Sequence, residues 1–271
     1  MSKKWLKVAL MVTAIATGTS IQVDAETVLY VPQDDRPVSL QYTVDTAKAA
    51  GMTVLTPPQN LISGKTYKGQ ADQIWNWVEQ NAGRADVMVL STDTLIYGGL
   101  VDSRKHNLPL STLENRLKRI EALKANHKNI RIYGFGTVMR SPRASGGGTE
   151  PSYYADYGPT IFQIAALQDK LDAGTLTQAE TQKLMSLQAS VPVEYLQDWF
   201  SRRQKNIQVN KDLIDEARNG VFAYFALGHD DTSQLSQSAL EGRYLNQYSK
   251  GIPRTQYGSF PGADQLGLLL M

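Results

Sequence analysis

Short apolar runs that stop at charged residues recur along the chain, and the first of them sets the pattern. It covers residues 28–31 and is followed by Pro32, which has no amide hydrogen to donate and so ends a strand. An apolar run of about four to eight residues is typical of a strand buried on both faces of a parallel sheet. We therefore predict a strand that places Asp34, Asp35 and Arg36 on a loop at its carboxyl end.

Four more runs of this kind alternate with helical patterns. The runs cover residues 52–56, 86–90, 130–135 and 221–227, and the helical patterns between the first four strands cover 39–50, 70–81 and 111–127. Ser111 and Glu114 predict a capping box at the start of the last of these helices. Strand, helix, strand order over so few residues predicts parallel strands joined by right-handed crossovers. The predicted fold class is α/β, with a parallel sheet of at least five strands that is either doubly wound or part of a β/α barrel.

The connection between the fourth and fifth predicted strands is longer than a crossover requires. It begins with a glycine run at 146–148 and three tyrosines, and residues 159–220 have a helical pattern with breaks at Gly174 and Pro192. A connection of this length is typical of an added functional segment. We predict a helical insert at about 153–220 that lies over the cleft and is more mobile than the sheet, as a lid is.

The first 25 residues follow a different pattern. Three lysines precede an apolar segment at 8–16, and small residues follow up to Ala25. The apolar segment is far shorter than the ~20 residues that a membrane-spanning helix needs, so we predict a signal peptide at 1–25 that is cleaved after Ala25. The mature protein is then secreted or extracytoplasmic in a bacterium, without a membrane span, and forms a single domain at 26–271. Residues 268–271 lie within an apolar run that has no stop signal, which predicts a truncated chain.

Charge and cysteine content narrow the classes of partner. Three of the 28 Lys and Arg and one of the 26 Asp and Glu lie in the predicted signal peptide, so residues 26–271 carry 25 of each sign. A balanced charge gives no general argument for nucleic acid or an anionic membrane surface as partner. The chain has no cysteine, which excludes disulfides and thiolate metal sites. The expected partner is a small polar molecule or a glycan, and the oligomeric state stays open.

The ends of the predicted strands collect the residues that can carry chemistry. The candidate catalytic residues are Asp34, Asp35, Asp93, His229, Asp230 and Asp231. The candidate substrate-binding residues are Arg36, Tyr97, Gly98, Gly99, Arg104, Arg140 and Arg143. A lone aspartate after a strand is more often a helix cap or a turn residue. Two Asp-Asp pairs at two strand ends, however, repel each other unless a cation, an arginine or a shared proton intervenes, and such arrangements occur mainly at functional sites.

Three motifs resemble a family of bacterial proteins that is catalogued as a domain of unknown function. They are Asp-Asp-Arg-Pro-Val at 34–38, Thr-Leu-Ile-Tyr-Gly-Gly-Leu-Val-Asp-Ser-Arg at 94–104 and Gly-His-Asp-Asp-Thr at 228–232. The resemblance extends over essentially the whole mature chain, and members of the family look longer than this chain. It implies membership of a family without an established reaction or catalytic residue, so function has to be argued from the residues themselves.

Those residues favour an exported hydrolase that acts on a polar substrate, a carbohydrate or a cell-wall glycan. Glycoside hydrolysis needs two carboxylates that face one cleft, and we expect the strand-end aspartates to line a common cleft. One alternative is a metal-dependent phosphoester or ester hydrolase, in which the Asp pairs and His229 bind a divalent cation. Another is an exported solute-binding protein without turnover. The expected cofactor is accordingly none or a divalent metal.

Overall fold

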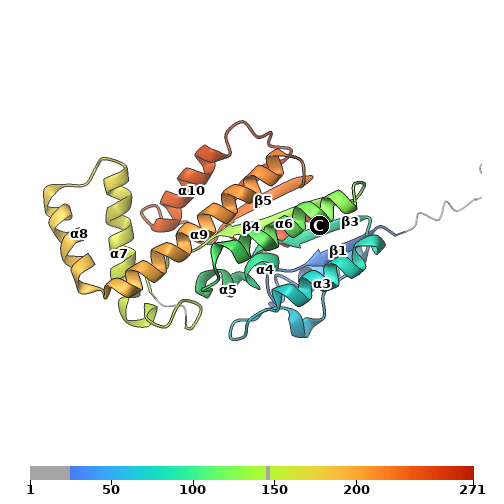
Figure 1. Cartoon of the computed structure of the whole chain (residues 1–271), viewed down its shortest axis with the longest axis horizontal. Helices are drawn as coiled ribbons and strands as arrows, with labels where there is room; N and C mark the ends of the chain where they lie inside the picture. The colour runs from blue at the N-terminus through green and yellow to red at the C-terminus, as the bar shows by residue number, and fades with distance from the viewer. Residues whose placement is uncertain (1–24, 145–146) are drawn as a thin grey trace, which may run out of the picture.

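The computed structural model describes residues 25–144 and 147–271, and a six-stranded parallel sheet lies at its centre (Figure 1). The strands are β1 (Thr27–Val31), β2 (Thr53–Leu55), β3 (Val87–Ser91), β4 (Arg131–Val138), β5 (Tyr224–His229) and β6 (Tyr257–Pro261). All neighbouring strands pair in parallel, which confirms the predicted fold class. The predicted signal peptide, apart from its last residue, lies outside the described residues.

Helices connect the strands and cover both faces of the sheet. They are α2 (Gln41–Ala49), α3 (Ala71–Asn81), α4 (Thr92–Tyr97), α5 (Leu100–Lys105), α6 (Leu110–Asn126), α7 (Tyr154–Asp172), α8 (Gln178–Ser190), α9 (Val193–Arg218), α10 (Gln237–Tyr248) and α11 (Leu266–Leu270), with 3₁₀ turns η1 (Gln59–Leu61) and η2 (Ala82–Arg84). In the described part of the chain, none of these helices combines the length and the apolar character that a membrane crossing needs.

The strands follow the order β2-β1-β3-β4-β5-β6 across the sheet. Within the described residues β2 and β6 each pair on one side only, so the sheet is open and doubly wound and does not close into a barrel. The chain runs from β1 outward to β2 and then returns to β3 on the other side of β1. Ligands of open parallel sheets bind outside the carboxyl ends of the strands at such a switch point.

Alternate residues of the strands face two different cores. Leu29 and Val31 of β1 belong to the larger core, to which α3, α6, α9 and α10 contribute. Val28 and Tyr30 belong to the core on the opposite face, which Leu266 of α11 and side chains near α2 complete. Because β1 is covered on both faces, its sequence is apolar throughout and shows no alternation.

The region at 153–220 contains the helices α7, α8 and α9. α7 starts five residues before the predicted helical region and includes Pro159. Together with α8 and the first half of α9 it surrounds Tyr154 and Trp199 in a core of its own, whereas Leu213 and Ile214 of α9 pack against the sheet. In Figure 1, α7 and α8 lie at the far end of α9, beyond the carboxyl ends of the strands. The mobility expected of a lid stays a prediction.

The structure differs from the sequence-based expectation at three places. The strand β6 was not predicted, because its short sequence with Gly258 and Pro261 hides the strand pattern. The residues directly after β3, for which the sequence predicted no helix, form α4. The expected capping box does not form, because α6 begins one residue early and Ser111 therefore lies inside its first turn.

An acidic groove between α6 and α9 gives a prediction about stability. Burial and the nearby carboxylates of Glu121, Asp215 and Asp212 raise the pKa of Glu216 to about 7. An unfolded glutamate titrates near ~4.3, so the folded state binds the extra proton and stability falls as pH rises from about 4 to 7. We expect Glu216→Gln to raise the free energy of unfolding by about 1–2 kcal/mol at pH 8 and to leave it unchanged near pH 4.

Urea denaturation across this pH range measures the effect. Glu114→Gln, in the same groove, is the control and should change the pH dependence little. A Glu216→Gln variant that is no more stable than the parent at pH 8 would show that Glu216 ionises freely in the folded protein.

Candidate functional site

A small cavity lies at the carboxyl ends of the strands, where residues following β1, β4, β5 and β6 meet α5. Its volume is about 210 Å³. The lining residues are Asp34, Arg36, Lys65, Leu100, Val101, Arg104, Arg140, Thr149, Asp230 and Asp264. None of them belongs to α7 or α8. Most of the lining is charged, which predicts a polar ligand.

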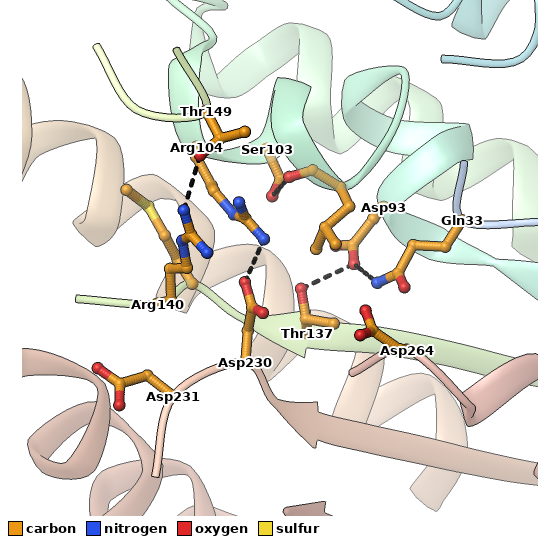
Figure 2. Close-up of polar contacts among 12 residues, drawn as sticks. Gln33, Asp93, Ser103, Arg104, Thr137, Arg140, Thr149, Asp230, Asp231 and Asp264 are labelled. Carbon is orange, nitrogen blue, oxygen red and sulfur yellow. Dashed lines mark hydrogen bonds and ion pairs between the residues drawn. The ribbon is translucent and has the colours of Figure 1, made fainter. Parts of the chain in front are cut away.

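An ion pair between Arg104 and Asp230 forms the buried wall of the cavity. Arg104 comes from α5 and Asp230 directly follows β5; their side chains are 5% and 12% exposed, and Arg104 Nη2 donates to Asp230 Oδ2 at 2.5 Å (Figure 2). Burial raises the pKa of Asp230, although Arg104 and Arg140 act in the opposite direction. Asp230 is therefore a carboxyl that can hold a proton at higher pH than an exposed aspartate does.

A second arginine, Arg140, lies beside this pair. Arg140 Nε donates to Glu150 Oε1 at 2.7 Å and its Nη2 donates to Thr149 Oγ1 at 2.7 Å. Glu150 Oε1 is also 4.0 Å from Arg104 Nη1. One buried carboxylate thus interacts with both guanidinium groups, and Figure 2 shows Arg104 and Arg140 close together above Asp230.

The backbone that carries Arg140 is fixed from behind by an arginine of α9. Arg203 donates to the carbonyl oxygens of Met139 at 2.7 Å and Arg140 at 2.8 Å. It also donates through Nε and Nη2 to the two carboxylate oxygens of Glu241 on α10, at 2.6 Å each, and both side chains are almost fully buried. Because a bidentate pair has a fixed geometry, α9 and α10 hold the β4 end in place.

Arg36 links the ends of β1 and β6 on the open side of the cavity. Its Nε donates to Asp34 Oδ2 at 2.8 Å, and its Nη2 donates to Asp264 Oδ1 at 2.9 Å. Asp34 is buried, whereas the Asp264 side chain is 53% exposed. Asp34 and Asp230 line the same cavity but have different partners, since Asp34 pairs with Arg36 and Asp230 pairs with Arg104.

Asp93 lies next to the cavity without lining it. Its Oδ2 accepts from Thr137 Oγ1 at 2.8 Å and from Gln33 Nε2 at 3.2 Å (Figure 2). Burial raises the pKa of Asp93 to about 6, and the charge of Asp230 adds to this effect. Gln33 Oε1 is buried and has no partner among the described residues. If its amide turns over, a protonated Asp93 can donate to that oxygen.

The family to which the chain belongs can be compared with this cavity. A family model described as "Protein of unknown function (DUF4127)" matches residues 28–271. The chain belongs to this family. The match confirms the resemblance drawn from the three motifs, and a search of curated proteins found no match. In this DUF4127 member each motif contributes at least one side chain to the cavity, among them Asp34, Arg104 and Asp230.

Besides Asp93, two more of the predicted catalytic aspartates of this DUF4127 member do not line the cavity. Asp35 accepts a hydrogen bond from the Tyr67 hydroxyl. Asp231 Oδ1 accepts from the Ser233 amide at 2.9 Å, the arrangement of an Asx turn, and Figure 2 shows its carboxylate pointing away from Asp230. The two Asp-Asp pairs therefore place only their Asp34 and Asp230 side chains in one cavity.

His229 and Arg143 also lie away from the cavity. His229 Nε2 is 2.7 Å from Ser259 Oγ, and its ring lies so close to Gly242 of α10 that a Cβ there would clash with it. The Arg143 guanidinium stacks over the Phe162 ring at 5.3 Å. In the described part of the chain, moreover, no three or more His, Asp or Glu side chains are grouped to hold a metal ion. The metal-site hypothesis thus has no ligand set among them.

The predicted binding residues Tyr97, Gly98 and Gly99 do not line the cavity and contribute to packing and backbone geometry instead. The Tyr97 ring packs against the His106 ring with centroids 4.9 Å apart and planes tilted by 31°. Gly98 ends α4 with φ of 113°, a conformation that favours glycine. A Cβ at Gly99 would lie 1.8 Å from Ser63 Oγ. The two glycines let the start of α5 approach the loop around Ser63, which places Arg104 in the cavity.

We expect Gly99→Ala to lower the free energy of unfolding by about 1–3 kcal/mol, because the added methyl group overpacks this contact. Urea denaturation measures the loss. Gly83→Ala is the matched control, since a Cβ there meets no atom within 4 Å, and it should be neutral or slightly stabilising. Equal stability of the two variants would mean that the α5 contact is loose.

Sequence reasoning missed Lys65, Thr149 and Asp264 in the cavity lining. Asp264 follows β6 as Asp34 follows β1, so recognising the sixth strand would have identified it. Lys65 and Thr149 come from loops without a strand or helix pattern, and no signal in the sequence singles them out.

Proposed function

We propose that this DUF4127 member is an exported hydrolase that acts on a polar carbohydrate or cell-wall glycan. The observation that carries the proposal is the pair Asp34 and Asp230, two carboxylates from different strand ends that line one cavity. Export rests on the predicted signal peptide at 1–25.

The different surroundings of the two carboxylates suggest different roles. The buried Asp230, whose pKa burial raises, is suited to act as the general acid that gives its proton to the leaving oxygen as the glycosidic bond breaks. Asp34, whose charge is balanced by Arg36, is suited to be the second carboxylate. It either takes a proton from the attacking water or attacks the sugar carbon itself.

A second candidate function is binding of a solute without turnover. It is favoured by the ion pairs of the cavity carboxylates, since Asp34 and Asp264 contact Arg36 while Asp230 contacts Arg104. Groups held in this way provide oriented hydrogen bonds to a ligand. A metal-dependent hydrolase is not proposed, because the described residues offer no ligand set.

The experiment is a turnover assay on the purified full chain with nitrophenyl glycosides, nitrophenyl uronides and cell-wall glycan fragments. Release of nitrophenol or of reducing ends supports the hydrolase. Binding of sugars in calorimetry without any release supports the solute-binding protein instead. If none of these compounds binds and none is hydrolysed, both candidates are contradicted.

A further inference from the structure

The cavity offers positive charge that its own carboxylates do not fully engage. Its lining includes four cationic side chains, Arg36, Lys65, Arg104 and Arg140, and three aspartates. All three aspartates form salt bridges with Arg36 or Arg104. Arg140 is paired with Glu150, which does not line the cavity, so the cation in excess is Lys65. A neutral sugar needs no such additional cation.

Lys65 is the cation that is left over. It lies in the loop between η1 and α3, is exposed, and makes no ion pair or hydrogen bond with any described residue. The side chain therefore keeps its three donors for a ligand.

Arg104 supplies a second, independent observation. Its side chain is 5% exposed, and its Nε is buried without a hydrogen-bond partner among the described residues. The charge of the neighbouring Arg140 adds to burial in lowering the Arg104 pKa. Two guanidinium groups so close together repel each other, and the buried carboxylate of Glu150 interacts with both.

We propose that the cavity binds a carboxylate or phosphate group of the substrate between Lys65, Arg104 and Arg140, so that the substrate is an acidic glycan. The inference rests on the proposed function for its assignment to a glycan. Arginine forks match the geometry of both anions, and lysine adds a point charge. The volume of about 210 Å³ is below the ~300–1,000 Å³ of drug-sized pockets and suits one sugar unit with its acidic group.

Isothermal titration calorimetry of the full chain tests the proposal, with galacturonate, glucuronate and glucose 6-phosphate against galactose and glucose. We expect the acidic sugars to bind at least about tenfold more tightly, as charge-assisted hydrogen bonds imply, and the affinity to fall with salt. Preference for the uronates identifies a carboxylate, and preference for glucose 6-phosphate identifies a phosphate; each supports the proposal.

Lys65→Gln should weaken binding of the acidic sugar by about three- to tenfold and leave neutral sugars unaffected. The matched control is Lys68→Gln, an exposed lysine of the same loop that does not line the cavity, and it should change neither. Equal affinity for acidic and neutral sugars, or binding of inorganic phosphate but of no acidic sugar, overturns the inference.

The outcomes keep this inference apart from the proposed function. Tight binding of uronates without hydrolysis of uronides retains the anion site and rejects the hydrolase. Hydrolysis confined to neutral glycosides retains the hydrolase and rejects the anion site.

Discussion

Asp230→Asn is expected to lower turnover by about 10²- to 10⁴-fold, the usual contribution of a positioned general acid. The carboxamide cannot give up a proton to the leaving oxygen, although its oxygen can still accept from Arg104. Arg104 keeps a hydrogen-bond acceptor at this position and Glu150 at 4.0 Å, so we expect a folded protein with a modest loss of stability. Steady-state kinetics, with circular dichroism to verify folding, measure both effects.

Asp231→Asn is the matched control because it changes the next residue in the same way. The Asp231 carboxylate takes part in a turn and does not line the cavity, so turnover should stay within about threefold of the parent. Equal losses in the two variants would assign the effect to the loop rather than to acid catalysis. A fully active Asp230→Asn variant would remove Asp230 from the mechanism.

The part of the site that could be predicted follows from topology. Right-handed crossovers between parallel strands bring all carboxyl ends to one edge of the sheet, so Asp34 and Asp230 meet although nearly two hundred residues separate them. The same rule places Arg140, which follows β4. Five of the six strands, and the helices α2, α3 and α6 between them, could be predicted, because helices cover both faces of the sheet and most of its strands are largely apolar.

What could not be predicted is the direction of individual side chains. The fifth strand was expected to end at residue 227 but continues to His229. Neighbouring residues at a strand end point to opposite sides, so His229 faces α10 while Asp230 reaches the cavity. An error of two residues in the predicted end of β5 thus changes whether His229 or Asp230 is expected to reach the cavity. Asp35 and Asp231 depend in the same way on loop geometry, which apolar periodicity does not report.

Asp93 provides the second large prediction, which concerns stability. Its pKa is raised to about 6, mainly by burial, and the side chain is 3% exposed. An aspartate in the unfolded chain titrates near ~3.9, so the folded protein binds the extra proton between about pH 4 and pH 6 and loses stability as pH rises through that range. A shift of about two pKa units sets an upper limit near 3 kcal/mol. The amide oxygen of an asparagine can accept the same bonds from Thr137 and Gln33 without carrying charge.

We therefore expect Asp93→Asn to raise the free energy of unfolding by about 1–3 kcal/mol at pH 7.5 and by almost nothing at pH 4, as measured by urea denaturation. Asp72→Asn is a control of opposite sign. A hydrogen-bonded ion pair with Arg116 lowers the Asp72 pKa, so this variant should lose stability near neutral pH, and only slightly because the Asp72 side chain is 69% exposed. If Asp93→Asn instead destabilises the protein at pH 7.5 more than at pH 4, Asp93 is ionised in the folded state. Its charge would then be a favourable part of the buried network with Thr137 and Gln33.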